Sequence, residues 1–89
     1  MTFVSHASDE FWELYRSLPP DIQKQADKQF ELFRQNPLHP SLRLKPVGQV
    51  WSARVNQAYR ALAYREGRVF YWFWIGSHKE YERVLHVKK

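Results

Sequence analysis

The 89-residue sequence contains no cysteine and only three glycines. Without thiols the chain has neither a disulfide framework nor a thiolate metal site, and a reducing cytoplasm is the expected compartment. It also has no phosphate-cradling glycine loop and no nucleophile elbow. A basic and apolar leader is missing from the start, as is any run of about 18 apolar residues. We therefore expect no secretory signal and no membrane span.

Positive charge is concentrated in the second part of the chain. The formal net charge is +5, from 14 Lys and Arg against 9 Asp and Glu. Residues 1–36 carry six acidic and four basic side chains, whereas residues 37–89 carry three acidic and ten basic ones. Such a basic surface attracts a polyanion, either a nucleic acid or an acidic protein. A surface that is merely solvated would explain the charge equally well.

Two amphipathic helices are predicted in the first part. In residues 9–18 apolar side chains recur at the spacing of one helical face: Phe11, Leu14, Tyr15 and Leu18. Ser8 is a suitable N-cap, and Pro19 ends this helix. The pattern resumes in residues 21–36 and stops before Pro37: Ile22, Ala26, Phe30 and Phe33. Two antiparallel helices joined by a tight turn, a helical hairpin, are therefore expected.

Short β-rich runs follow from residue 42 onward. The runs are "LRLKPV", "VWSARV", "AYRALAYR" and "RVFYWFWI", separated by turn residues at Gly48–Gln49, Asn56–Gln57 and Glu66–Gly67. This pattern indicates an antiparallel meander. The last run lacks polar alternation, so we place it centrally, covered on both faces, and "TFVS" can add an edge strand. Ser77 and Glu80 form a capping-box pattern, which predicts a short C-terminal helix.

These elements predict one α+β domain over residues 1–89. Its N-terminal helical hairpin packs on a small, curved, mainly antiparallel sheet, and a short helix ends the chain. Aromatic residues make up 17% of the sequence, more than a minimal core requires. Neither a metal nor another cofactor is predicted, because His78 and His86 lie eight positions apart with no nearby carboxylate pair at helical ligand spacing.

Basic and aromatic side chains share the strands and their exits, a composition that suits RNA, since cations meet phosphates and rings stack on bases. His78 and Tyr81 lie three positions apart at a helix start and can face the same side. Cleavage by internal attack of a 2′-hydroxyl needs a proton acceptor, a proton donor and a cation beside the phosphorane. Imidazole, phenol and guanidinium groups fill these roles without a metal. The residues expected to hold RNA are Arg43, Lys45, Arg54, Arg65 and Lys79.

Each candidate also has a structural explanation. A histidine after a strand is more often a surface or capping residue, and a helical tyrosine more often packs. An arginine in a strand commonly lies over a neighbouring ring. A two-residue turn at Asn56–Gln57 would set Arg60 opposite Ala53, on the other face from Arg54. Only a bulge or a longer turn lets both arginines serve one site.

Three stretches carry a resemblance to a known family: "LPPDIQKQADKQFELFRQNPLHPSLRLKPV", "WSARVNQAYRALAY" and "FWIGSHKEYERVL". The passages "NPLHPSL" and "IGSHKEY" are distinctive as a pair. Over nearly its whole length the sequence resembles the RelE/ParE superfamily of bacterial type II toxins, most closely the RelE-like mRNA interferase branch. The resemblance implies that Arg60 lies at the scissile phosphate, that His78 is a catalytic histidine, and that Tyr81 lies near a catalytic aromatic position.

The resemblance further implies a cytoplasmic toxin that cuts mRNA in the ribosomal A site. An antitoxin encoded beside it would neutralise the toxin, and the complex would bind operator DNA through that antitoxin. The lysine-rich site of some relatives is represented here only by Lys45 and Arg43. Gyrase poisons share the fold without ribonuclease chemistry. A gyrase-poisoning toxin and a non-toxic relative that only pairs with its antitoxin are therefore the alternatives.

Overall fold

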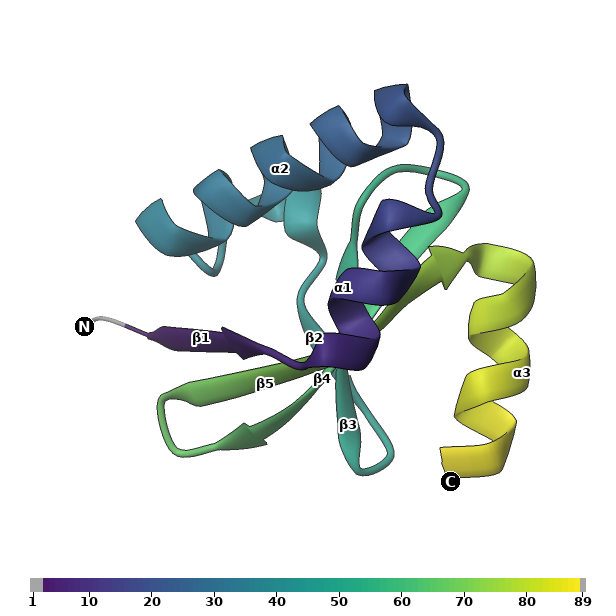
Figure 1. Cartoon of the computed structure of the whole chain (residues 1–89). Coiled ribbons are helices and arrows are strands. Elements are labelled where there is room, and N and C mark those ends of the chain that lie inside the picture. The colour runs from purple at the N-terminus through teal and green to yellow at the C-terminus, as the bar shows by residue number, and fades with distance from the viewer. Residues whose placement is uncertain (1–2, 89) are drawn as a thin grey trace.

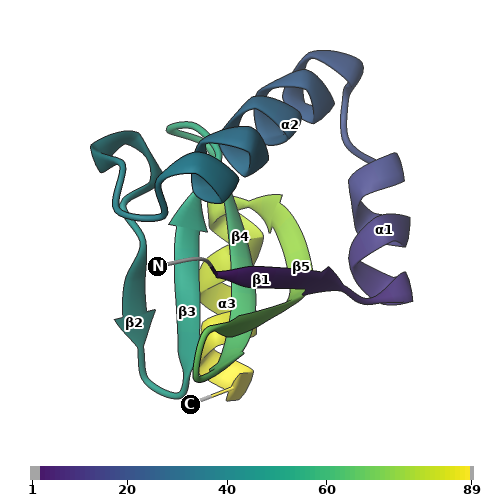
Figure 2. The ribbon, with the colours of Figure 1, turned by 90° about the vertical axis from the view of Figure 1, so that its left-hand side faces the viewer.

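The computed structural model describes the backbone of residues 3–88 and the side chains of residues 3–86. A five-stranded sheet lies between two N-terminal helices on one face and a C-terminal helix on the other (Figures 1 and 2). In chain order the elements are β1 (Val4–Ala7), α1 (Asp9–Arg16), α2 (Pro20–Gln35), the 3₁₀ turn η1 (Pro40–Leu42), β2 (Lys45–Val47), β3 (Val50–Arg54), β4 (Tyr59–Glu66), β5 (Val69–Ser77) and α3 (His78–Lys88). The predicted α+β class is confirmed.

The strands follow the order β1-β5-β4-β3-β2. The four C-terminal strands form the expected antiparallel meander, and β1 adds to β5 in parallel. This edge strand corresponds to "TFVS", of which Thr2 lies outside the described residues. Gly48 and Gly67 both have a φ of 61°, which suits glycine and lets the chain reverse tightly between strands. The aromatic run is an internal strand as predicted, because β5 lies between β1 and β4. It is neither the central strand, which is β4, nor covered on both faces throughout, since Tyr71 is 42% exposed.

The strand β5 contains a bulge that changes which face its residues occupy. Leu62 pairs with Trp74, whereas the next residue, Ala63, pairs with Trp72, so Phe73 is the extra residue. Trp72 faces α1 and α2, while Phe73 and Trp74 pack on the α3 side. The absence of alternation in the second half of this strand therefore has two causes, at least partial burial on both faces and the bulge, whereas Tyr71 in the first half is exposed.

The two N-terminal helices meet at their joint and diverge from it (Figures 1 and 2). Ser8 caps α1 as predicted, because its Oγ accepts from the backbone N–H of Phe11 at 3.1 Å. At the joint the Gln23 side chain donates to three main-chain carbonyls, those of Tyr15, Arg16 and Leu18. Phe30, placed on the buried face by its spacing, is in fact 46% exposed, because the divergence leaves this part of α2 without a facing helix.

The C-terminal helix begins with the predicted capping box. The backbone N–H of Glu80 donates to Ser77 Oγ, and the Ser77 hydroxyl donates to the Glu80 carboxylate. The backbone N–H of His78 donates to the carbonyl of Ala58 at 2.7 Å, which fixes the start of α3 beside the β3–β4 loop. Among the helices of residues 3–88, none combines the length and apolarity that a bilayer crossing requires.

Candidate functional site

The loop between β3 and β4 places two arginines side by side. The N–H groups of Val55 and Asn56 both donate to the Tyr59 carbonyl, so the connection is longer than a two-residue turn. Arg54 consequently pairs directly with Arg60. Both side chains lie on the α3 face, because Leu62, two residues after Arg60, packs there. The longer turn, which the sequence left open, is the one that the structure adopts.

Arg60 is held by the loop that precedes it. Its Nη1 group donates to the main-chain carbonyls of Asn56 and Tyr59. The Asn56 side chain stabilises this loop, because its Oδ1 accepts from the N–H groups of Ala58 and Tyr59 at 2.7 and 2.9 Å. The guanidinium group is therefore anchored through one nitrogen, and its position is set by the backbone of the loop.

The charges around Arg60 are crowded. Burial lowers the pKa of Arg60 below the ordinary arginine value, and the positive charge of Arg54 lowers it further. Tyr81 raises it, and Arg43 adds a smaller lowering. Arg43 lies just after η1 in the left-handed region, at φ 45°, and is exposed. A cluster of like charges with little anionic compensation is suited to bind an anion such as a phosphate.

Three aromatic side chains lie near the arginines where β5 leads into α3. The His78 ring stacks on the Tyr81 ring, with centroids 5.4 Å apart, and Trp74 lies beyond at 6.5 Å from Tyr81. His78 is exposed, whereas Tyr81 is 7% exposed and packs in the core with Val50 and Leu62. The imidazole is thus accessible to a ligand, and the buried phenol ring supports it from below.

Gly76 makes this arrangement possible. It pairs with Arg60 across the strands, and a Cβ atom at this position would lie 2.7 Å from Cζ2 of Trp74. The indole therefore occupies the space over the glycine backbone. A side chain at residue 76 would displace the indole from its place beside Tyr81.

The predicted RNA-binding residues do not all lie on the same face of the sheet. Lys45 pairs with Ser52, so it lies on the α3 face at the edge of the sheet, one step along from Arg54. Lys79 is exposed on α3. Arg65 lies on the opposite face, over the rings of Phe3, Trp51 and Phe70 at 4.8–5.2 Å. The candidate site therefore unites Arg43, Lys45, Arg54, Arg60, His78 and Tyr81, and Arg65 is separate from it.

Sequence reasoning missed three contributors to this site. Asn56 was interpreted only as a turn residue, although its spacing to Tyr59 is that of a side chain that closes a loop. Trp74 belongs to the run that the sequence places in the sheet, and its contact over Gly76 was not predicted. No local signal in the sequence marks Gln29, whose side chain donates to the main-chain carbonyls of Ser41 and Arg54. Within residues 3–86, no group of three or more His, Asp and Glu side chains could hold a metal ion.

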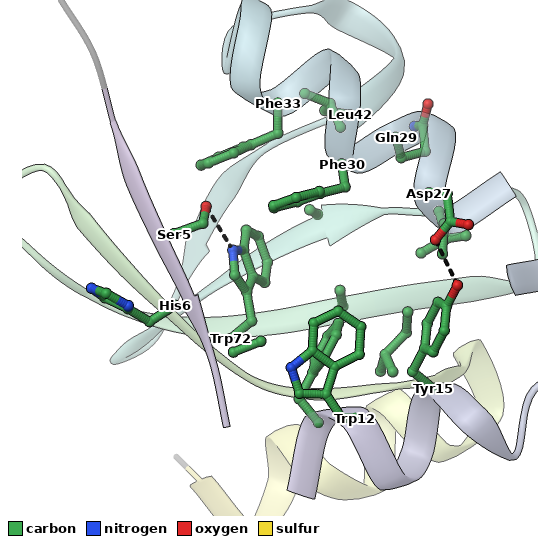
Figure 3. A pocket seen from close by; sticks show the side chains of 17 residues that line it. Ser5, His6, Trp12, Tyr15, Asp27, Gln29, Phe30, Phe33, Leu42 and Trp72 are labelled. Atoms are coloured by element: carbon green, nitrogen blue, oxygen red, sulfur yellow. Dashed lines mark hydrogen bonds between the residues drawn. The ribbon is translucent and has the colours of Figure 1, made fainter. Parts of the chain in front are cut away.

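A second surface lies on the other face of the sheet, between α1 and α2. An apolar cavity of about 180 Å³ opens there. In Figure 3 Trp12 and Tyr15 approach it from α1, and Phe30 and Phe33 approach it from α2. Trp12 and Phe30 are 43% and 46% exposed. The Tyr15 hydroxyl donates to Asp27 at 2.6 Å and connects the two helices across the cavity.

The model of the ParE-like toxin domain family matches residues 20–83 of the chain. The chain therefore belongs to this family, within the RelE/ParE superfamily of type II toxin–antitoxin toxins. No curated protein matches the chain in sequence.

Solved structures share the fold at low sequence identity. YafQ from E. coli strain BL21(DE3) is 11% identical, with a TM-score of 0.71 over 89% of this chain and 97% of YafQ. A double mutant of the E. coli toxin RelE in the free state is 15% identical, with a TM-score of 0.70 over 99% of this chain and 97% of RelE. A chain of the RelB–RelE antitoxin–toxin complex from Methanococcus jannaschii is 16% identical, with a TM-score of 0.68 over 88% and 95%. The RelE-like fold is confirmed by these likenesses.

Proposed function

We propose that this toxin is an endoribonuclease that cuts mRNA on the ribosome and so arrests translation in the cytoplasm. One observation carries the proposal: the Arg54–Arg60 pair and the His78–Tyr81 stack lie at the same end of the same sheet face. Their proximity is supported by the bond from the His78 N–H to Ala58, in the loop that holds Arg60. Cations and an accessible imidazole at one place are suited to the transfer of a phosphoryl group from the 5′-oxygen to the 2′-oxygen of RNA.

The chemistry needs two proton transfers and one cation. The 2′-oxygen of RNA gives up its proton and forms a bond to phosphorus, while the bond from phosphorus to the 5′-oxygen breaks and that oxygen gains a proton. In our proposal His78 carries out one of these transfers, as general base or general acid, because imidazole exchanges protons near neutral pH. Arg60 stabilises the negative charge that develops on the phosphorane. Tyr81 supports the His78 ring and offers its hydroxyl as the partner.

The remaining cations would hold the RNA backbone. Arg54 pairs with Arg60 on the α3 face, Arg43 is close enough to lower the pKa of Arg60, and Lys45 lies on the same face at the edge of the sheet. Lys79 extends the charge along the helix. Arg54 is partly exposed and the other three are exposed, as contacts to phosphates require. The Arg65 guanidinium, expected from the sequence to join them, would instead stabilise the other face through its three rings.

Purified protein added to translating ribosomes tests this function. The wild-type chain is expected to produce cuts at fixed positions within codons, and His78→Gln is expected to lose them while remaining folded. His86→Gln is the matched control, because it makes the same change at another exposed position of α3. Unchanged cutting by His78→Gln would remove this residue from the mechanism, and no cutting by the wild type would remove the ribonuclease proposal.

The match to the ParE-like toxin domain favours a second candidate function, that of a toxin that binds and poisons DNA gyrase. Expression in cells separates the two. Rapid arrest of protein synthesis favours the ribonuclease, whereas DNA damage signalling with translation intact favours the gyrase poison. Harmless overexpression without an antitoxin would indicate a relative that has lost toxicity.

The partner in our proposal is a neutralising antitoxin with an acidic segment and apolar anchors. Antitoxin–toxin complexes are known for the related RelB–RelE pair of M. jannaschii and the DinJ–YafQ pair of E. coli. In this chain the basic residues of the α3 face suit the acidic segment. The apolar cavity, with exposed Trp12 and Phe30 at its rim, suits the anchors.

A salt series on association with the neighbouring gene product tests the partner proposal. The association rate is expected to fall as salt rises, because attraction between opposite charges is screened beyond about 8 Å at physiological ionic strength. A Trp12→Ser variant is expected to speed dissociation, since it removes apolar contact area. An association rate that does not change with salt would mean that the antitoxin does not approach the basic face.

A further inference from the structure

A glutamine on α2 joins two of the segments that carry the arginines. Gln29 is half-buried, and its Nε2 group donates to the carbonyl of Arg54 at 2.9 Å and to that of Ser41 at 3.2 Å. Arg54 is the last residue of β3, and Ser41 lies in η1, two residues before Arg43. A single side chain therefore links the backbone beside Arg43 to the backbone of Arg54.

Repulsion acts against this arrangement. Burial and then the charge of Arg54 lower the pKa of Arg60, and Arg43 contributes in the same direction, so both of these arginines are close enough to Arg60 to repel it. Repulsion of this kind tends to separate the segments that carry the charges. A neutral amide can hold the segments together without adding a carboxylate that would compete with a phosphate for the arginines.

A second contact from the same helix reaches the third arginine. Gln25, one turn before Gln29, accepts a hydrogen bond from the side-chain amide of Asn56. The main-chain carbonyl of Asn56 in turn accepts from Arg60. The helix α2 thus contacts the segments that hold each of the three arginines, although it covers the opposite face of the sheet.

We propose that Gln29 is a positioning residue that sets the spacing of Arg43 and Arg54, and with them the phosphate-binding geometry around Arg60. Gln29 itself lies on the α2 side and does not contact the RNA. Misplacement of reacting groups by about 1 Å can reduce a rate by about 10²-fold. Loss of both hydrogen bonds at Gln29 is therefore expected to slow cleavage about tenfold or more. This kinetic consequence rests on the proposed ribonuclease function, whereas the spacing of the arginines does not.

The test compares two glutamines of α2. Gln29→Met removes the two hydrogen bonds at nearly unchanged volume. Gln23→Met removes the three hydrogen bonds at the α1–α2 joint, away from the arginines. Both variants are expected to lower Tm, and only Gln29→Met is expected to reduce the single-turnover cleavage rate on ribosomes. Gln29→Asn, whose shorter amide cannot reach both carbonyls, replaces Gln29→Met if that variant does not fold.

A measurement independent of activity completes the test. The guanidinium ¹⁵Nε resonances of Arg43, Arg54 and Arg60 are expected to shift in Gln29→Met and to stay in place in Gln23→Met. Equal rates in the two variants, or unshifted arginine resonances in Gln29→Met, would overturn the positioning role. If the wild type cuts no mRNA, the proposed function fails, and the resonances alone decide the role of Gln29.

Discussion

The same strands contribute side chains to the main apolar core on one face of the sheet and to the candidate site on the other. Toward α1 and α2 twelve of the described residues form one buried apolar cluster, whereas toward α3 the buried cluster has three members. The arginine pair lies at the end of β3 and β4 on the face with the smaller cluster. Because side chains alternate along a strand, a small domain can keep one face for stability and place cations on the other without burying them in its main core.

The sharpest test of this division replaces one arginine on each face of the sheet with glutamine. Arg60→Gln is expected to reduce cleavage by on the order of 10²-fold or more, because a cation beside the phosphorane is lost. Its stability should change little, since removing Arg60 also relieves repulsion with Arg54. Arg65→Gln should lower stability through its three ring contacts and leave the rate unchanged. Cleavage assays and urea unfolding of both variants measure this. Similar cleavage rates in the two variants would show that cleavage does not depend on which face of the sheet carries the arginine.

A smaller effect is expected where the α3 face depends on tight packing. Gly76→Ala should destabilise the fold by about 1–3 kcal/mol, because the new Cβ meets the Trp74 indole. Cleavage should also fall as the indole moves against Tyr81. The control is Gly67→Ala, where the backbone at φ +61° is strained by a side chain but no atom lies within 4 Å. If both variants lose stability and keep the same cleavage rate, Trp74 does not support the site.

The α1–α2 side is expected to respond to pH. The hydrogen bond to Asp27, burial and the charge of Asp27 together raise the pKa of Tyr15 to about 12. Because the raised pKa belongs to the folded state, this stabilisation is complete below pH 10 and is lost as the pH rises toward 12. Tyr15→Phe should therefore cost about 1 kcal/mol at pH 7. In urea unfolding the difference from wild type should shrink between pH 10 and 12. A difference that is constant with pH would contradict this assignment.

The smallest predicted effect concerns the edge of the basic face. Lys45→Ala should reduce the slope of log affinity against log salt for single-stranded RNA by about 0.7, the value for one phosphate contact. Lys28→Ala, on the exposed side of α2, should leave the slope unchanged. Titrations at several salt concentrations distinguish the two. An equal change in both variants would indicate that the RNA meets the whole surface rather than one face.

Local patterns predict most of this fold. Helical periodicity, the Ser8 cap and the Ser77–Glu80 capping box are short-range properties, and the structure confirms each of them. The pairing of Arg54 with Arg60 could not be predicted, because it depends on how the Asn56 side chain closes the loop. The face occupied by Arg65 could not be predicted either, since it follows from the same register. The contacts of Gln29 depend on tertiary packing, which no local pattern records.

The bulge in β5 divides the strand into two segments in which the numbering of the core-facing positions differs by one. Before Phe73 the even-numbered positions, Phe70 and Trp72, point to the α1–α2 core, and after it the odd-numbered Ile75 does. Deleting Phe73 would restore a regular alternation of side chains along the whole strand, with the other residues on their present faces. A regular strand that kept Phe73 would instead turn Trp74 and Gly76 toward the main core, and Ile75 would emerge beside Arg60. One inserted amino acid thus lets the first half of the strand direct Phe70 and Trp72 into the main core while the second half keeps Trp74 and Gly76 beside the candidate site.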